Sequence, residues 1–384
     1  MSGLHGGPVV IVGGGVIGMA LAYHLTRHGY REVTVVERGR VGEGATARAT
    51  GGIRQQFTAA VNARLVRRSV DFFSAFAEHT GAPLTFRQHG YLFLLSDQAQ
   101  LAAFRDAVAM QNQWDIPSRM LRPDEITEVF PQVRTGDLAG ASYCPTDGSA
   151  SPTDATAGLF RAARAGGATV YEQRTATGLR RDRAGQVTGV ETDAGALPAE
   201  AVVLAPGPWA AELGARVGVP LPVTPHRRQA FAIAPARWLH PSLPFTVDLS
   251  TGSYLHPEGA GGVIGGNDRA TPPGTDTTVD WQLVESLAAA LSHRIPPMAD
   301  AQVVRGWAGL REMSPDDLAL VGPIPHLPGL WVAVGFSGHG FMQAPAVGEC
   351  LAAQLLGEPS PVDLTPLRPD RFDGSPVTAE AVRF

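Results

Sequence analysis

The first 40 residues constrain the fold most strongly, because they place a strand, a glycine-rich turn, a helix and a second strand in close succession. The apolar run Pro8–Val12 leads directly into Gly13-Gly14-Gly15-Val16-Ile17-Gly18, and a second apolar run, Val33–Val36, ends at Glu37. A buried strand followed by such a turn and a helix is typical of a Rossmann-type βαβ unit. We therefore expect a parallel sheet in the N-terminal part of the chain.

A dinucleotide is the ligand that this turn favours. Gly13 permits the tight turn, Gly15 lets the backbone approach a pyrophosphate, and Gly18 lets the helix pack closely on the strand. The phosphates then bind at the helix N-terminus, where free N–H groups and the helix dipole favour negative charge. Glu37 is placed to accept hydrogen bonds from both ribose hydroxyls and would repel a 2′-phosphate, so FAD or NAD is expected rather than NADP.

The composition describes an ordinary globular chain with a sizeable core. Its 384 residues are 44% hydrophobic and exceed one average domain, so two domains are expected. The net charge of −5 offers no basic surface, and we expect no nucleic-acid partner. The apolar run Val9–Leu25 is interrupted by glycines and lacks a signal-peptide cleavage site, so we expect a cytoplasmic protein without a membrane partner.

Two reactive residue types are scarce. Only Cys144 and Cys350 occur, far apart and without metal-ligand spacing, so neither a disulfide framework nor a metal site is expected. The chain contains no lysine, and all 31 basic residues are arginine. Mechanisms that need a lysine amine, such as Schiff-base chemistry and lysine-assisted activation of oxygen, are therefore excluded.

Strand, glycine turn and helix recur later in the chain. A buried strand at Ala201–Ala205 runs into Pro206-Gly207-Pro208-Trp209, and a strand at Leu330–Val334 is followed by Gly335–Gly340 and the apolar helix Phe341–Leu356. Short strands between Val223 and Val304 predict a mostly antiparallel sheet, and Val61–His79 is expected to form one amphipathic helix. The predicted fold is α/β, α+β overall, with a Rossmann-like domain and a second domain on the antiparallel sheet.

Together these segments resemble the D-amino acid oxidase superfamily of FAD enzymes, in particular its glycine oxidase, sarcosine oxidase and dimethylglycine dehydrogenase branch. The resemblance is carried by the N-terminal fingerprint, the Thr46–Arg54 loop, Ala205–Trp209, Trp307–Arg311 followed by Ser314-Pro315-Asp316, and Gly335–Phe341. It implies a discontinuous FAD-binding domain (1–85, 148–220 and 318–384) and a substrate domain (86–147 and 221–317). It also implies that an amine substrate passes hydride to the flavin, leaving an imine that hydrolyses, with O2 or another acceptor taking the electrons.

The fingerprint and the resemblance together assign a set of residues to FAD. These are Gly13, Gly15, Val16, Ile17, Gly18, Glu37, Arg38, Ala45, Thr46, Arg48, Gly51, Gly52, Ala176, Ala205, Gly207, Trp209, Gly309, Arg311, Gly335, Gly338, His339, Gly340, Phe341 and Met342.

Two arginines are candidates for binding a substrate carboxylate. Arg311 occupies the position that has this role in proteins resembling glycine oxidase, and a planar guanidinium pairs both carboxylate oxygens and stays charged when partly buried. The alternative for Arg311 is a surface position or an internal ion pair with Glu312 or Asp316. Arg54 matches an arginine of the sarcosine oxidase pattern, and its alternative is to brace the loop on the flavin.

Three further residues are candidates for the site. His339 lies in the last glycine turn, where its N–H or the neighbouring backbone would stabilise negative charge on reduced flavin; the alternative is a structural histidine. By the resemblance, Tyr254 and His256 lie on a strand that faces the flavin and would shape the substrate pocket.

The chain also departs from the sarcosine oxidase pattern. Met342 stands where that pattern has a carboxylate-binding lysine, which favours a bulkier or more apolar substrate. The lysine linked to oxygen reactivity is missing, so a dehydrogenase that passes electrons to another acceptor is considered as well as an oxidase. FAD is expected to be non-covalent, because Arg305–Met313 lacks the linking cysteine and Arg48 stands where dimethylglycine dehydrogenase relatives have a histidine.

Two other functions remain open. A 2-hydroxy acid dehydrogenase of the same fold needs a base for the hydroxyl proton, and His256 or His339 would supply it. Alternatively, the chain is an FAD-containing subunit of a complex or an assembly factor, with a partner subunit and no turnover of a small molecule.

Overall fold

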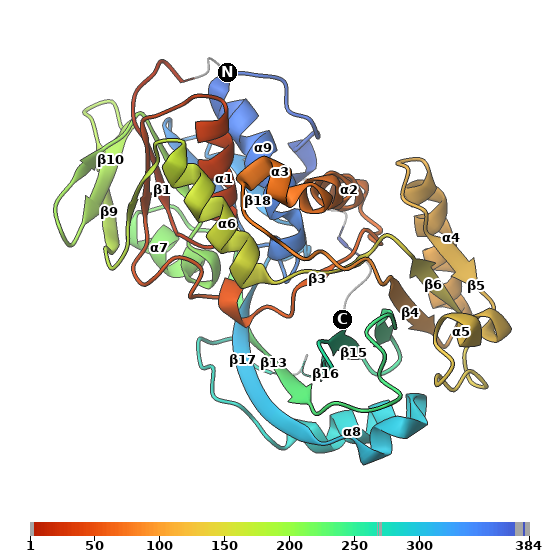
Figure 1. Ribbon diagram of the computed structural model, residues 1–384. Helices are drawn as coiled ribbons and strands as arrows, with labels where there is room; N and C mark the ends of the chain where they lie inside the picture. The colour runs from red at the N-terminus through yellow and green to blue at the C-terminus, as the bar shows by residue number, and fades with distance from the viewer. Residues whose placement is uncertain (1–3, 267, 269–270, 373–378, 381–384) are drawn as a thin grey trace.

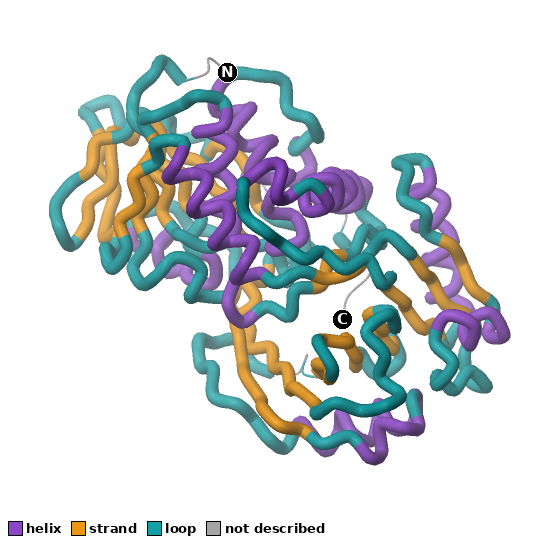
Figure 2. The backbone as a smooth tube through the Cα atoms, viewed as in Figure 1, coloured by secondary structure: helices purple, strands orange, loops and turns teal. Residues whose placement is uncertain are grey.

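The structure is a computed structural model that describes residues 4–266, 268, 271–372 and 379–380. Two large β-sheets occupy opposite parts of the molecule, and helices cover both (Figures 1 and 2). One sheet is mostly parallel and the other mostly antiparallel, as expected from the sequence.

The first sheet has six strands. In spatial order they are β18 (Leu320–Pro323), β19 (Leu330–Val334), β12 (Ala201–Leu204), β1 (Val9–Val12), β2 (Val33–Val36) and β8 (Thr169–Tyr171). All neighbours are parallel except β18 and β19. Because this sheet is covered on both faces, its central strands are uninterrupted apolar runs.

Alternate residues of β1 enter two separate cores. Val9 and Ile11 pack toward α1 (Val16–Arg27), α9 (Gly340–Leu356), α6 (Pro152–Ala165) and α2 (Ala60–Ser74). Val10 and Val12 pack on the opposite face. That face is covered by α7 (Ala210–Arg216) and by a small sheet of β9 (Ala176–Arg181), β10 (Val187–Thr192) and β11 (Leu197–Pro198).

The second sheet has eight strands. In spatial order they are β17 (Val303–Met313), β13 (Thr224–Ile233), β16 (Gly261–Gly266), β15 (Ser253–Glu258), β14 (Phe245–Asp248), β4 (Tyr91–Leu95), β6 (Gly140–Cys144) and β5 (Arg119–Leu121). Only the β4–β14 pair among them is parallel. Helices α4 (Gln98–Asn112), α5 (Pro123–Val129) and α8 (Leu283–Arg294) flank it, and α8 lies below β13 and β17 in Figure 1.

Short elements connect the two sheets. Strands β3 (Gly52–Ile53) and β7 (Gly148–Ser149) form a two-stranded ribbon between them. The 3-10 turns are η1 (Thr46–Arg48), η2 (Gly207–Trp209), η3 (Pro296–Asp300), η4 (Thr365–Leu367) and η5 (Pro369–Phe372). Among the described residues, no helix combines the length and the apolar character that crossing a bilayer requires.

Among the differences from the sequence expectation, two concern long elements. The expected single helix Val61–His79 is two helices, α2 and α3 (Phe76–Thr80), because Ala75 leaves the helical conformation (φ −107°, ψ 23°). The break lets Phe76 pack against Gly158, where a Cβ would lie 2.6 Å from the Phe76 ring. The longest strand, β17, was not anticipated, since Gly306 and Gly309 interrupt its β-forming pattern.

Candidate active site

A cavity of about 840 Å³ extends from the Gly13–Gly18 turn to the eight-stranded sheet. Both sheets contribute to its wall. Strand β17 curves upward from α8 in Figure 1 and contacts η2. Gly309 on β17 touches η1 so closely that a Cβ there would lie 2.7 Å from the Cβ of Arg48. The missing side chain at this position therefore brings the two parts of the wall together.

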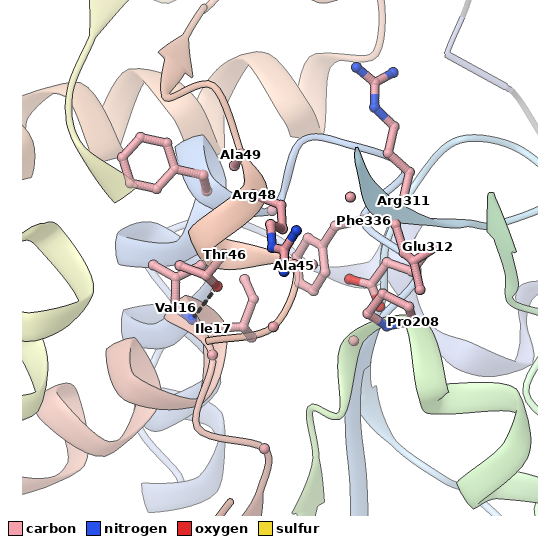
Figure 3. A pocket seen from close by; sticks show the side chains of 18 of the residues that line it. Val16, Ile17, Ala45, Thr46, Arg48, Ala49, Pro208, Arg311, Glu312 and Phe336 are labelled. Carbon is pink, nitrogen blue, oxygen red and sulfur yellow. Dashed lines mark hydrogen bonds between the residues drawn. The ribbon is translucent and has the colours of Figure 1, made fainter. Parts of the chain in front are cut away.

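The glycine turn forms one end of this cavity. Gly13 has φ +117°, and a Cβ there would lie 2.1 Å from the Ala205 carbonyl oxygen, so only glycine fits between β1 and β12. Gly18 lies beneath the turn, with its Cβ position 2.0 Å from the Gly13 oxygen. The Val16 N–H donates to Thr46 Oγ1 over 3.1 Å, which ties η1 to the start of α1 (Figure 3).

The carboxylate of Glu37 is fixed at the end of β2. Its Oε2 accepts a hydrogen bond from Gly14 N at 2.7 Å, and its Oε1 accepts one from Gly39 N at 2.8 Å. Each carboxylate oxygen has a second lone pair, so both remain able to accept from ribose hydroxyls. Beside it the Arg38 guanidinium lies 3.7 Å above the Trp209 ring, and both residues line the cavity.

These features fit a dinucleotide. The turn presents backbone N–H groups at the N-terminus of α1, and Glu37 lies beyond the turn at the same end of the cavity. At Gly207 (φ +59°) a Cβ would project into open space, so the backbone of η2 is exposed to a ligand.

Nearly all the residues that the sequence assigned to FAD line this cavity. They are Gly13, Gly15, Val16, Ile17, Glu37, Arg38, Ala45, Thr46, Arg48, Gly51, Gly52, Ala176, Ala205, Gly207, Trp209, Gly309, Arg311, Gly338, His339, Gly340, Phe341 and Met342. Gly18 and Gly335 are not part of the wall, because Gly18 lies under the turn and a Cβ on Gly335 would lie 2.8 Å from Leu320 Cδ1.

Arg54 is buried at the far end of the cavity, with none of its surface exposed. Its Nη1 donates to the Gln56 carbonyl oxygen over 2.5 Å, and its Nη2 lies 3.1 Å from His339 Nε2. The guanidinium also stacks 4.0 Å above the Phe57 ring. Burial lowers the pKa of Arg54, but a guanidinium retains its charge in proteins.

Arg311 lines the same end from β17. It lies against Gly338, where a Cβ would be 2.8 Å from the Arg311 Nε. Asp316, one of the two acids considered as an ion-pair partner for Arg311, forms a two-bond ion pair with Arg371, at 2.8 Å for each bond. Arg54, in the loop after β3, and Arg311, on β17, thus line one cavity although they come from different elements.

An aromatic wall completes this end; the sequence singled out Tyr254 in it but not Tyr91 or Phe245. Tyr91 stacks on Phe245 with ring centroids 4.2 Å apart, and Phe245 lies 5.2 Å from Tyr254. All three line the cavity. They come from β4, β14 and β15, so no local pattern groups them. Burial raises the pKa of Tyr254 to about 12, which keeps its hydroxyl neutral.

His256 lies outside this cavity, contrary to the expectation that it faces the flavin together with Tyr254. It lines a second cavity of about 680 Å³, which shares residues 48–50 and Trp307 with the first. Its ring stacks on Phe245 at 4.9 Å and lies 6.0 Å from His89. Burial, and to a smaller extent the neighbouring His89, lowers its pKa to about 3.

His339 is a neutral residue of the first cavity. Burial, with the positive charges of Arg54 and Arg311, holds its pKa well below the ordinary value. Its Nε2 faces the Arg54 guanidinium, which only donates. His339 therefore accepts at Nε2 and carries its proton on Nδ1.

Glu312 was considered only as a partner for Arg311, yet it lines the cavity itself. Burial raises the pKa of its carboxyl to about 7, against the backbone N–H groups of Gly335 and Phe336, which lower it. The sequence signal that could have identified Glu312 is its position next to Arg311. Where a strand passes along a cavity, neighbouring residues of the strand can both line it.

Comparison with known proteins identifies the dinucleotide that this chain binds. Residues 8–354 match a family model described as FAD dependent oxidoreductase. The chain belongs to this family. FAD is its cofactor, and the expected resemblance is confirmed.

Two relatives match along nearly their whole length. The glycine oxidase of Geobacillus kaustophilus is 32% identical over 379 residues, which cover 96% of this chain and 98% of that protein. The crystal structure of L-proline dehydrogenase from P. horikoshii has a TM-score of 0.90 at 32% identity and covers 95% of this chain and 97% of that one.

A third relative is not named as an oxidoreductase. The mitochondrial pyruvate dehydrogenase phosphatase regulatory subunit of Mus musculus is 28% identical and covers 92% of this chain. The chain spans 42% of that relative's length. A protein named as a regulatory subunit thus contains a region similar in sequence to this chain.

Proposed function

We propose that this chain oxidises the C–N bond of an amino, imino or N-alkyl amino acid, giving an imine that hydrolyses. One observation carries the proposal: Arg54 and Arg311 line one end of the FAD cavity, beside an aromatic wall and a neutral histidine. Two positive charges favour a carboxylate, and apolar rings favour a small uncharged remainder. The names of the full-length relatives, glycine oxidase and L-proline dehydrogenase, agree with such a substrate.

FAD supplies the hydride acceptor when it is bound. Arg311 is proposed to pair both carboxylate oxygens through its planar fork. Arg54, fixed by Gln56 and His339, adds a rigid buried charge behind the site. Tyr254 offers a neutral hydroxyl, while Tyr91 and Phe245 exclude water from the reacting carbon.

The geometry favours an amine over a 2-hydroxy acid. Oxidation of an alcohol requires a base for the hydroxyl proton, whereas an amine need only arrive as the neutral amine, and its oxidation then proceeds without an enzymic base. His256 faces the second cavity with a pKa of about 3, and His339 accepts from Arg54 at Nε2. Neither of the two candidate histidines is thus well placed as a base.

The proposal includes a division of the chain. Residues 1–85, 148–220 and 318–384 are assigned to FAD binding, and 86–147 with 221–317 to the substrate. The division is supported by the strands, since every strand of the six-stranded sheet belongs to the first set and every strand of the eight-stranded sheet to the second.

We further propose that FAD is bound without a covalent link. Neither Cys144 nor Cys350 lines the cavity. The segment that lacks the linking cysteine lies on the cavity wall at Gly309, next to Arg48, which stands where dimethylglycine dehydrogenase relatives have a histidine. Precipitation with acid should therefore leave the yellow colour in the supernatant. Colour that stays in the protein pellet would contradict this part of the proposal.

We propose that O2 or another electron acceptor reoxidises the flavin. We also propose that the protein is cytoplasmic. Met342 lines the cavity where the sarcosine oxidase pattern has lysine. Because the chain contains no lysine, a dehydrogenase is proposed as an alternative to an oxidase.

The decisive experiment is anaerobic mixing of the yellow protein with glycine, sarcosine, L-proline, D-proline and L-lactate, following flavin absorbance. Bleaching by an amino or imino acid is expected, and readmitted air then separates an oxidase from a dehydrogenase. Bleaching by lactate alone would contradict the proposal and favour the 2-hydroxy acid function. If dithionite bleaches the flavin but none of these compounds does, the subunit function gains support, as the regulatory-subunit relative illustrates.

A further inference from the structure

Glu312 is an acid in a part of the cavity where the mechanism uses none. It follows Arg311 on β17, and successive residues of a strand point to opposite faces. In Figure 3 the Arg311 side chain points away from Pro208, while the Glu312 carboxyl points toward Phe336 and Pro208. The two neighbours thus face different regions of one cavity.

The carboxyl of Glu312 is incompletely satisfied. No described residue forms a hydrogen bond with its Oε2, although this atom is shielded from solvent. Its backbone is fixed, because the Glu312 carbonyl oxygen accepts from Ser337 N over 2.9 Å. A buried polar atom without a partner costs about 1–3 kcal/mol, so a ligand that supplies the missing bond is favoured.

The surroundings of Glu312 identify that ligand. Pro208 belongs to η2, which follows β12 beside the glycine turn, and Phe336 belongs to the turn before α9. Both line the cavity assigned to FAD. The Glu312 carboxyl therefore points into the part of this cavity that η2 and the turn before α9 enclose.

We propose that Glu312 binds the flavin half of FAD by donating a hydrogen bond from its protonated carboxyl. The inference rests on the proposed placement of FAD and not on the proposed substrate. Glu312 acts here as a binding residue for the cofactor, and no step of the oxidation passes through it.

The charged groups near Glu312 are consistent with a neutral carboxyl. Across the β13–β17 pair its register partner is Pro225, and His226 lies opposite Arg311. The residues of the 335–338 turn are uncharged, and the N–H groups of Gly335 and Phe336 lower the pKa of Glu312 by less than burial raises it. Helix α7 contributes Glu212 and Arg216, of opposite sign, to the same cavity. Burial raises the pKa of Glu312 to about 7, so the carboxyl is half protonated near neutral pH even without FAD.

The test measures how FAD dissociates from the diluted holoenzyme. Free FAD is separated by ultrafiltration at pH 6.0 and pH 8.5 and measured by fluorescence, in wild type, Glu312→Gln, Glu312→Leu and Glu128→Gln. Glu128 is an exposed glutamate on α5, so its variant makes the same change of charge away from the cavity.

For wild type and Glu128→Gln we expect a dissociation constant about tenfold higher at pH 8.5 than at pH 6.0, since binding retains one proton. Glu312→Gln still donates from its amide, so its affinity should be close to the wild-type value at pH 6.0 and should not change with pH. Glu312→Leu should bind about tenfold more weakly at pH 6.0.

Three results would overturn the inference. The first is an equal pH dependence in wild type and Glu312→Gln, and the second is wild-type affinity that rises with pH, which indicates an ionised acceptor. The third is a Glu312→Leu variant that binds FAD as tightly as wild type. Because no substrate is present, failure of the proposed amine oxidation leaves this test unaffected.

Discussion

The Nη2 atom of Arg54 lies 3.1 Å from the Nε2 atom of His339, although the two residues are 285 positions apart in the sequence. This contact joins the loop after β3 to the turn before α9. Since the guanidinium donates and His339 accepts, the positive charge of the pair belongs to Arg54. The contact explains why a histidine in this turn orients an arginine more readily than it removes a proton.

We predict that His339→Gln leaves the pH profile unchanged in shape. Glutamine retains an acceptor for Arg54, and His339 is already neutral above its lowered pKa. The measurement is the rate constant of anaerobic flavin reduction between pH 6 and pH 8, in variant and wild type. By contrast, His339→Leu removes the acceptor and should lower the free energy of unfolding by about 1–3 kcal/mol. A limb near pH 6.5 that disappears only in His339→Gln would show that the histidine titrates.

We predict that Arg311→Met raises the KM for the substrate about 10- to 100-fold, because a bidentate charged hydrogen bond is lost. The melting temperature should change little, since Arg311 is only partly buried. Arg105→Met is the matched control, because Arg105 is exposed on α4. If Arg54→Lys raises the KM strongly and Arg311→Met does not, Arg54 is the arginine that binds the carboxylate.

The C-terminal segment contributes a cap to α2. Ala59 provides no side-chain cap, and Glu380 instead accepts from Thr58 N at 2.9 Å and Ala59 N at 3.1 Å. We predict that Glu380→Ala lowers the free energy of unfolding by about 0.5–2 kcal/mol, measured by urea denaturation. Glu258→Ala, at an exposed strand end, is the control. Equal stability of both variants would mean that Glu380 does not cap the helix in solution.

How far the sequence predicts this molecule depends on how local each feature is. The strand, turn and helix around Gly13–Gly18 are set within 30 residues by steric and hydrophobic rules, so they were predictable. The Glu380–Thr58 contact spans 322 residues, and no local pattern encodes it. β17 was missed because its glycines serve close packing: at Gly306 a Cβ would lie 2.8 Å from Phe231.

The site shows the same limit. Tyr254 and His256 lie on one face of β15, and the sequence treats them alike. Tertiary packing separates them, because His256 stacks with Phe245 and His89 and faces the second cavity. Glu312 was considered only as an ion-pair partner of Arg311. Because β17 was not predicted to be a strand, there was no reason from the sequence to place the two side chains on opposite faces.

Asp147 is fully buried, and its carboxylate binds the loop after β3 that carries Arg54, here called the Arg54 loop. Its Oδ1 accepts from Gln55 N at 2.8 Å and from Gln55 Nε2 at 2.9 Å, and its Oδ2 accepts from Gln56 Nε2 at 3.1 Å. Burial raises its pKa from 3.8 to about 6, although these hydrogen bonds oppose the shift. The folded protein therefore holds this proton more tightly than the unfolded chain.

The sign of the pH effect follows from this shift. The stabilising contribution of protonated Asp147 is fully present below its unfolded pKa and is lost as the pH rises through about 6. We predict that Asp147→Asn removes this loss, so its free energy of unfolding falls less steeply between pH 4 and pH 6 than that of wild type or of Asp106→Asn. Asp106 is an exposed residue of α4 and serves as the matched control. Parallel curves for all three proteins would show that the hydrogen bonds from Gln55 and Gln56 fully offset burial, so that Asp147 supports the Arg54 loop as a carboxylate at every pH in this range.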